Sequence, residues 1–192
     1  MRKSGILMPI FSLPSRYGIG DFSKKAYEFA DFLKESGQQL WQILPLGPTG
    51  FGDSPYQSFS AFAGNPYMIS LDKLIDDGLL TKKDCDEADL VSDTDSIDYG
   101  KLYQNRISLL KKAFELNNLK DKSVYREFCS KSSFWLDDYA LFMAMKKYFG
   151  GCEWIKWQED ARLGKSKESS RKTSISALLT MLKPLIVWIT IS

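Results

Sequence analysis

Histidine is missing from this sequence altogether, and cysteine is scarce. With no imidazole among its 192 residues, the chain cannot assemble a Ser-His-Asp triad, a Cys-His pair or a His-ligated metal site. The three cysteines, Cys85, Cys129 and Cys152, are odd in number and far apart, which fits neither a disulfide framework nor a zinc-binding pattern. Any catalysis must therefore rest on carboxylates, Tyr, Lys or Arg, and we expect a reducing, cytoplasmic location.

Long hydrophobic runs are also lacking. The amino-terminal run Ile6–Ile10 is short, contains Pro9 and leads to no small-residue cleavage site, unlike the core of a signal peptide. The apolar stretch 175–192 has 18 residues, the lower limit for a membrane span, but Lys183 and Pro184 interrupt it. We therefore expect no membrane span, with anchoring by this tail as a weaker alternative.

Charge of one sign is not abundant either, since the net charge is +2. Residues 161–192 carry six Lys and Arg against one Glu, so the first 160 residues are mildly acidic. An acidic body offers no footprint for nucleic acid, and a basic stretch at one end is typical of a flexible tail. We expect no nucleic-acid partner.

The amino-terminal third has the pattern of a strand, a helix and a second strand. Residues 5–10 predict a short buried strand, and residues 39–44 predict another. Between them Ala26, Phe29 and Leu33 repeat at helical spacing, with Ser23 available as a cap. This order predicts a right-handed βαβ unit with two parallel strands, and therefore an α/β fold.

Each predicted strand leads into a turn-rich loop. The first loop covers residues 12–21 and the second covers 44–66, LPLGPTGFGDSPYQSFSAFAGNP, where four Pro and four Gly forbid a long helix or strand. In parallel α/β folds ligands bind at the carboxyl ends of the strands, so both loops should face one cleft. In the second loop, aromatic and short polar side chains that suit a carbohydrate lie together: Asp53, Ser54, Tyr56 and Gln57.

The same residues also match other kinds of site in part. Gly47, Gly52 and Ser54 have the spacing of a phosphate-binding loop, but Asp53 stands where Lys is required and would repel phosphate. From spacing alone, Asp53 and Ser54 could equally cap a turn before Pro55. Asp137 and Asp138 are neighbours on a predicted helix and point about 100° apart, which favours a role at the helix dipole over paired catalysis.

Beyond residue 70 the sequence predicts mainly helices. Short helices are expected over 71–80 and 81–88, a longer one over 99–116, and one that is apolar nearly all round, and so buried, over 134–149. Residues 124–130 predict a further turn or two of helix. No internal repeat is present.

Three motifs together resemble the 4-α-glucanotransferases known as amylomaltases or disproportionating enzymes. In order along the chain they are SLPSRYGIGDF, WQILPLGPTGFGDSPYQSFSAFAGNPYMISLDKL and DDYALFMAMKKYFGG, followed by WQEDARL. The resemblance covers about Ser4 to Leu163. It implies a (β/α)8 TIM barrel with helical insertions, and transfer of α-1,4-glucan segments between maltooligosaccharides by a retaining double displacement. It implies no metal and no organic cofactor.

The resemblance also assigns residues. Ser54 and Tyr56 match the family's donor-site loop, while Asp53 and Pro55 match positions that shape it. Phe51 stands where the family commonly has Tyr at a secondary glucan contact, so stacking is retained and a hydroxyl is lost. The expected substrate-binding residues are therefore Phe51, Asp53, Ser54 and Tyr56, with no catalytic residue assigned.

The family's nucleophile, acid/base and third carboxylate have no counterpart within residues 1–192, and from about Gly164 the sequence departs from the family's pattern. A (β/α)8 barrel needs about 250 residues. We therefore expect the incomplete start of a barrel in residues 1–70, an inserted α-helical subdomain in 71–160, and an aberrant or disordered tail in 161–192. We expect an inactive fragment, with a non-catalytic α-glucan-binding or interaction remnant as the alternative.

Overall fold

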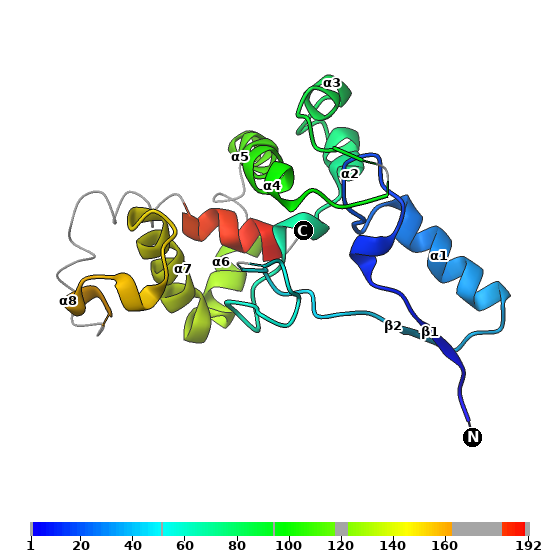
Figure 1. The fold of residues 1–192 in the computed structure, drawn as a ribbon, viewed down its shortest axis with the longest axis horizontal. Helices are drawn as coiled ribbons and strands as arrows, with labels where there is room; N and C mark the ends of the chain where they lie inside the picture. The colour runs from blue at the N-terminus through cyan, green and yellow to red at the C-terminus, as the bar shows by residue number, and fades with distance from the viewer. Residues whose placement is uncertain (1, 51, 94, 118–122, 163–181, 191–192) are drawn as a thin grey trace. The chain divides into compact units, whose positions relative to one another are not determined.

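The structure, a computed structural model, describes residues 2–50, 52–93, 95–117, 123–162 and 182–190. The chain forms two compact units, Met1–Asn118 and Leu119–Ile191. Figure 1 shows the order of their elements along the chain.

The first unit begins with the predicted strand, helix and strand. Strand β1 (Gly5–Leu7) pairs in parallel with β2 (Leu40–Gln42), and Ile6 lies opposite Trp41. Helix α1 (Lys24–Glu35) connects the two strands (Figure 1). The prediction of a parallel βαβ unit is confirmed, because a crossover helix is what returns the chain to start a parallel strand.

Helix α1 is held by a small apolar core. Ala26 and Leu33 are its buried residues, seven positions apart and so on one face. Ala26 belongs to a cluster with Ile10, Leu13 and Met68, against which Phe29 and Trp41 pack. The Phe29 and Trp41 rings meet edge to face with centroids 4.9 Å apart. The loops at the carboxyl ends of the strands are thereby fixed to the helix.

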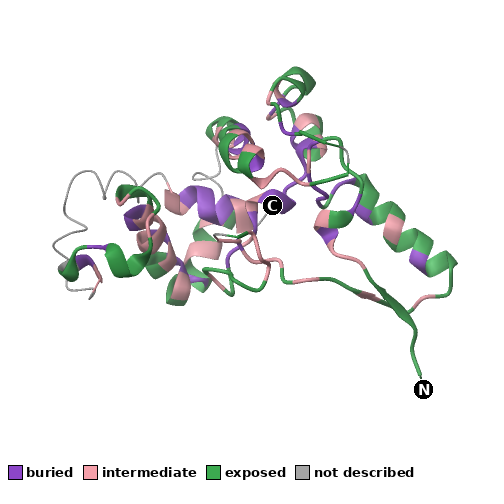
Figure 2. Cartoon of the chain, in the orientation of Figure 1, coloured by how far each residue is buried: buried purple, intermediate pink, exposed green. Residues whose placement is uncertain are grey.

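The prediction that residues 5–10 form a buried strand is wrong. The strand ends at Leu7, and residues Ile10–Ser12 form a 3-10 turn (η1) after Pro9. All three residues of β1 are exposed, including Ile6 and Leu7 (Figure 2). The side chains of a strand become buried when further strands and helices cover the sheet. Among the described residues the sheet has only two strands, so the side chains of β1 stay exposed.

Beyond residue 70 the regular elements of the first unit are helices, as predicted. A 3-10 turn η2 (Pro66–Met68) leads into α2 (Leu71–Asp76), and α3 (Lys82–Asp86) follows. The predicted helix over 99–116 is present as three continuous parts: α4 (Tyr99–Lys101), a π-helical turn η3 (Leu102–Arg106) and α5 (Ile107–Leu116). Leu71, Leu102 and Leu110 are buried and provide the apolar contacts of these helices.

An ion pair joins α3 to α5. Asp84 accepts a hydrogen bond from Lys112 at 2.7 Å, and it also completes a capping box with Thr81. The Lys112 contact, followed by the cap, lowers the pKa of Asp84 to about 2. A carboxylate with a lowered pKa stabilises the fold above its unfolded pKa of about 4, and this contribution is lost as the pH falls toward 2.

We therefore expect Asp84→Asn to lower the melting temperature at pH 6, and the difference from the unsubstituted chain to shrink between pH 4 and pH 2. Lys112→Met removes the largest cause of the pKa shift and should reproduce this pattern. The measurement is thermal unfolding followed by circular dichroism at several pH values. A difference that stays constant from pH 6 to pH 2 would contradict the assignment.

The second unit contains α6 (Ser123–Lys131), α7 (Ser133–Tyr148), the 3-10 turn η5 (Trp154–Lys156) and α8 (Glu159–Arg162). The core of this unit includes Ala144, Met145 and Trp157. The prediction that the helix over 134–149 is buried nearly all round is wrong, because Phe134 is 70% exposed while Leu136, Ala140 and Ala144 are buried at four-residue intervals. Only one face of α7 therefore packs into the core of the second unit.

Two further predictions concern charged or apolar residues of this unit. Asp137 does not lie in the first turn, since α7 begins at Ser133, so the helix-dipole interpretation is wrong. Its carboxylate instead pairs with Lys183.

Residues 182–190 of the predicted tail are helical, and Leu185, Val187 and Trp188 are buried. The tail residues 163–181 lie outside those that the structure describes. Within the described residues no helix is long and apolar enough to cross a membrane.

Candidate functional site

The loop that follows β2 is irregular but well fixed. Between β2 and η2 its only regular pairing in the described residues is an antiparallel bridge between Thr49 and Ser58. Serine side chains make most of its internal hydrogen bonds. Ser58 Oγ donates to the carbonyl of Ser60 at 2.7 Å, and Ser60 Oγ accepts from the backbone amides of Phe62 and Ala63. The predicted structured loop is thus confirmed in its local geometry.

Asn65 ties the end of this loop to its beginning. Its side-chain amide donates to the carbonyl of Gly47 at 3.1 Å, and its backbone amide donates to the carbonyl of Leu46. Its side-chain oxygen accepts from the amide of Tyr67 at 2.9 Å and so caps η2. The Asn65 side chain is buried with these partners satisfied, as buried polar groups must be. The loop therefore closes on itself as a rigid unit.

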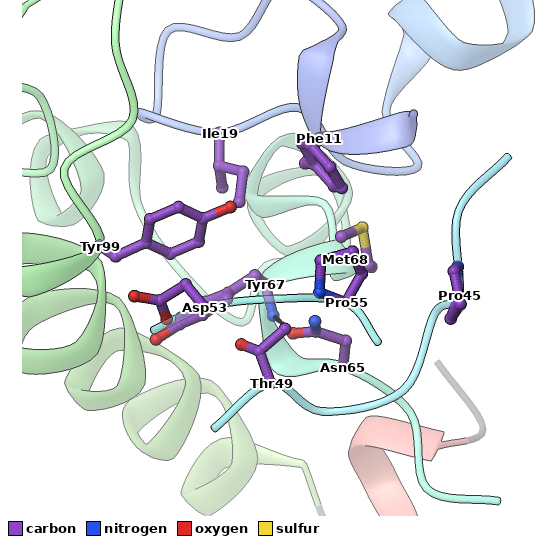
Figure 3. A pocket seen from close by; sticks show the side chains of 10 residues that line it. All are labelled: Phe11, Ile19, Pro45, Thr49, Asp53, Pro55, Asn65, Tyr67, Met68 and Tyr99. Carbon is purple, nitrogen blue, oxygen red and sulfur yellow. Dashed lines mark hydrogen bonds between the residues drawn. The ribbon is translucent and has the colours of Figure 1, made fainter. Parts of the chain in front are cut away.

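A pocket lies where this loop meets the loop that follows β1. Its cavity volume is about 10 Å³, roughly the space that one water molecule needs, so the pocket is a small hollow that opens to solvent at its mouth. The first loop and the turn before it contribute Phe11 and Ile19, and the second loop contributes most of the remaining wall. The residues that line the pocket are Phe11, Ile19, Pro45, Thr49, Asp53, Pro55, Asn65, Tyr67, Met68 and Tyr99 (Figure 3). The prediction that both loops face one cleft is confirmed.

The predicted site residues are distributed unevenly around this pocket. Asp53 lines it, together with Pro55. Ser54 and Tyr56 are adjacent in sequence but are not part of its wall. Ser54 Oγ accepts a hydrogen bond from the amide of Tyr56 at 3.3 Å, and the Tyr56 side chain is 72% exposed. Phe51 lies outside the described residues. The loop therefore offers the half-buried acid Asp53 in the pocket wall and, next to it in sequence, the exposed ring of Tyr56.

Asp53 has an unusual backbone conformation. Its φ is 52°, in the left-handed region that few residues other than Gly, Asn and Asp adopt. Its amide donates to the carbonyl of Gly50 at 3.2 Å, which closes a tight turn. Strain of this kind persists only where surrounding structure imposes it, and it is common at ligand sites. The turn is what directs the Asp53 side chain to the pocket.

Two tyrosines share the pocket wall with Asp53 (Figure 3). The rings of Tyr67 and Tyr99 have centroids 6.0 Å apart. Burial raises the pKa of the Asp53 carboxyl group. Burial, followed by the Asp53 charge, raises the pKa of Tyr67 to about 12, and the same two causes raise the pKa of Tyr99. At neutral pH both phenols are protonated and able to donate hydrogen bonds, so the wall presents the Asp53 carboxylate as an acceptor and these two phenols as donors beside apolar faces.

Asn65, Tyr67 and Tyr99 are among the wall residues that were not predicted. A signal for Asn65 exists, because Asn before Pro is typical of a capped turn. Tyr99 has none, since it lies more than thirty residues beyond the loop and reaches the pocket only through the packing of the helices. Among the described residues no cluster of three His, Cys, Asp or Glu could hold a metal ion.

Comparison with known proteins gives consistent results. A family model described as 4-alpha-glucanotransferase matches residues 8–180. A 4-alpha-glucanotransferase from Clostridium butyricum is 49% identical over 161 residues, which cover 84% of this chain and 33% of that protein. One from Thermus thermophilus is 42% identical over 181 residues, covering 92% and 35%. The chain thus spans about a third of the length of the curated relatives it matches.

Solved structures show the same similarity. An amylomaltase from Streptococcus agalactiae, in complex with acarbose, superposes with a TM-score of 0.88 at 38% identity, over 98% of this chain and 39% of that one. An amylomaltase from Corynebacterium glutamicum superposes with a TM-score of 0.63 over 96% of this chain and 26% of that one. At 20% identity the second match speaks to the fold alone.

Proposed function

This chain belongs to the 4-alpha-glucanotransferase family, and from that premise we propose that it binds an α-1,4-glucan at the pocket between its two strand-end loops. The family reaction moves a glucan segment from one maltooligosaccharide to another, and the pocket would hold the donor. The observation that carries the proposal is the pocket wall itself, in which Asp53 and two protonated tyrosines stand beside apolar residues. Sugars need this mixture, because their hydroxyl groups alternate with apolar ring faces.

The residues of the pocket and its loop would have different roles in binding the glucan. Asp53 would accept hydrogen bonds from sugar hydroxyl groups, and Tyr67 and Tyr99 would donate to sugar oxygens. Tyr56, exposed beside the pocket, would stack on a ring face, and Ser54 would hold the Tyr56 backbone in place through its 3.3 Å contact. Phe51, the remaining predicted contact, stays a proposal that rests on the family resemblance.

Bond cleavage requires more than this wall provides. A retaining double displacement uses two carboxyl groups about 5 Å apart, one as nucleophile and one as acid and then base. Of the described residues that line the pocket, Asp53 alone carries a carboxylate. We therefore propose that residues 1–192 supply binding and orientation and do not themselves cleave the glycosidic bond. No metal or organic cofactor enters this proposal.

The proposed architecture follows the same premise. Residues 1–70, with β1, α1 and β2 in parallel order, would be the incomplete start of a (β/α)8 barrel. Residues 71–160 would be an inserted helical subdomain. Of the predicted aberrant or disordered tail over 161–192, residues 182–190 form a helix with buried side chains that belongs to the second unit. The superposition on the S. agalactiae amylomaltase supports this assignment.

Calorimetric titration with maltotetraose tests the binding proposal. We expect measurable heat at millimolar sugar, and none with cellotetraose, which has the same length but β-1,4 linkages. Incubation with maltotriose should release no glucose and form no longer oligosaccharide. Longer products together with glucose would contradict the claim that the chain does not cleave. Equal heats for the two tetrasaccharides, or none for either, would contradict a donor-glucan site and favour an interaction remnant.

A further inference from the structure

Arg106 is a fully buried cation that the reaction described above does not use. It ends the π-helical turn η3, and its side chain is 0% exposed. A π-helical turn holds one more residue than an α-helical turn, which changes the direction of the side chains after it, and such turns are frequent at functional sites. Leu102, four residues earlier, is buried as well, so this turn faces the interior of the first unit.

The guanidinium group holds both strand-end loops. From the first loop, Asp21 accepts from Nη2 at 3.1 Å and the carbonyl of Tyr17 accepts from Nη1 at 3.4 Å. From the segment after the second loop, the carbonyls of Ile69 and Tyr67 accept from Nη2 at 2.6 Å and 3.2 Å. One side chain therefore binds two segments that are about fifty residues apart in sequence.

Each of these segments carries part of the pocket wall. Ile19 lies between Tyr17 and Asp21, and Met68 lies between Tyr67 and Ile69. Tyr99 begins α4, which leads directly into η3 and so to Arg106. We infer that Arg106 is a positioning residue, which fixes three walls of the glucan-binding pocket through a single guanidinium group. The inference rests on the proposed function for the identity of the ligand, but the placement of the walls can be measured without a ligand.

Only arginine can make this set of contacts. Its planar fork lets Nη1 reach Tyr17 while Nη2 reaches Ile69, whereas lysine presents one nitrogen that cannot reach both carbonyls together. The third nitrogen, Nε, is buried with no hydrogen-bond partner among the described residues. Asp21, 2% exposed, balances the charge and also accepts from the amide of Ser23 at 3.0 Å. Burial lowers the pKa of Arg106 and raises that of Asp21, while their mutual attraction opposes both shifts.

A paired substitution separates positioning from overall stability. Arg106→Met alone leaves the Asp21 carboxylate buried without its cation, so it should unfold much of the protein. Combining Arg106→Met with Asp21→Asn removes both charges, and Asn can still accept from Ser23. In the double variant the three carbonyls lose their donor without a buried lone charge. Lys111→Met, in α5, is the matched control for loss of a cation from the same helix.

The first readout is amide hydrogen exchange. The amide of Phe22 donates to Met68 at 3.2 Å across the two loops, and Gly20 donates to Phe11. In the double variant we expect the amides of Gly20, Phe22 and Met68 to exchange about tenfold faster or more, while those of α1 change little. Uniformly faster exchange, or no change at the three amides, would overturn the inference in favour of a general structural role.

The second readout is the dissociation constant for maltotetraose, which we expect to rise about tenfold in the double variant and not in Lys111→Met. Selective loosening of the loops with unchanged affinity would overturn the positioning role. If the unsubstituted chain binds no maltotetraose, the proposed function fails. The amide hydrogen exchange of Gly20, Phe22 and Met68 then decides by itself whether Arg106 holds the pocket walls. Arg106→Lys should resemble the double variant in both readouts if the fork geometry is what matters.

Discussion

Gly18→Ala is expected to lower the free energy of unfolding by about 3 kcal/mol or more, because it combines backbone strain with a steric clash. Gly18 has φ of +81°, a left-handed conformation that costs Ala about 1 kcal/mol. In addition, a Cβ atom at this position would lie 2.3 Å from the carbonyl oxygen of Leu90 and 3.4 Å from a methyl group of Leu102. The obstacle at Leu90 is backbone and cannot rotate away.

Gly78→Ala is the matched control. Gly78 has a similar φ of +71°, but a Cβ atom there would have no neighbour within 4 Å. Its cost should be the conformational strain of about 1 kcal/mol alone. Urea unfolding of both variants, followed by tryptophan fluorescence, gives the difference. Equal losses for the two variants would show that the close approach of Leu90 to Gly18 is not a constraint.

Tyr56→Ala is expected to weaken maltotetraose binding about tenfold, which corresponds to the roughly 1–2 kcal/mol that stacking of an aromatic face on a partner provides. The Tyr56 side chain is 72% exposed, so its loss removes little packing and should leave the melting temperature nearly unchanged. Tyr56→Phe should keep most of the affinity, because stacking needs the ring and not the hydroxyl. Calorimetric titration measures all three proteins.

Tyr27→Ala controls for the loss of an exposed tyrosine. The Tyr27 side chain is 59% exposed on α1, where its hydroxyl accepts from Lys73 at 2.9 Å, and it is not part of the pocket wall. Its removal should leave sugar affinity unchanged. If Tyr56→Ala binds maltotetraose as tightly as the unsubstituted chain, Tyr56 has no stacking role and the donor-loop assignment loses its aromatic platform.

Local patterns predicted the parts of the fold that depend on local contacts. The helical spacing of Ala26 and Leu33 and the two short apolar runs around it gave the parallel βαβ unit, and the order of elements alone placed the two loops at one pocket. Asp53 could be selected because its neighbours are turn formers and aromatics. In each case the deciding interactions lie within about ten residues or follow from chain direction.

The remainder depends on contacts between distant residues. Nothing near Arg106 distinguishes it from a surface arginine, and only packing reveals that its side chain meets Asp21, 85 residues away. Tyr99 reaches the pocket in the same way. The burial of β1 and of all sides of α7 was predicted wrongly from their apolar composition. Apolar side chains can be buried, but whether they are depends on which other elements pack against them.

The exposed strand β1 has a practical consequence for the chain in solution. Its backbone amides and carbonyls, with the apolar side chains of Ile6 and Leu7, form a template on which an extended segment of another copy could add. Arg2 and Lys3 come directly before the strand and are exposed. In a second copy added in parallel register the same two cations would lie nearby, and like charges oppose such pairing.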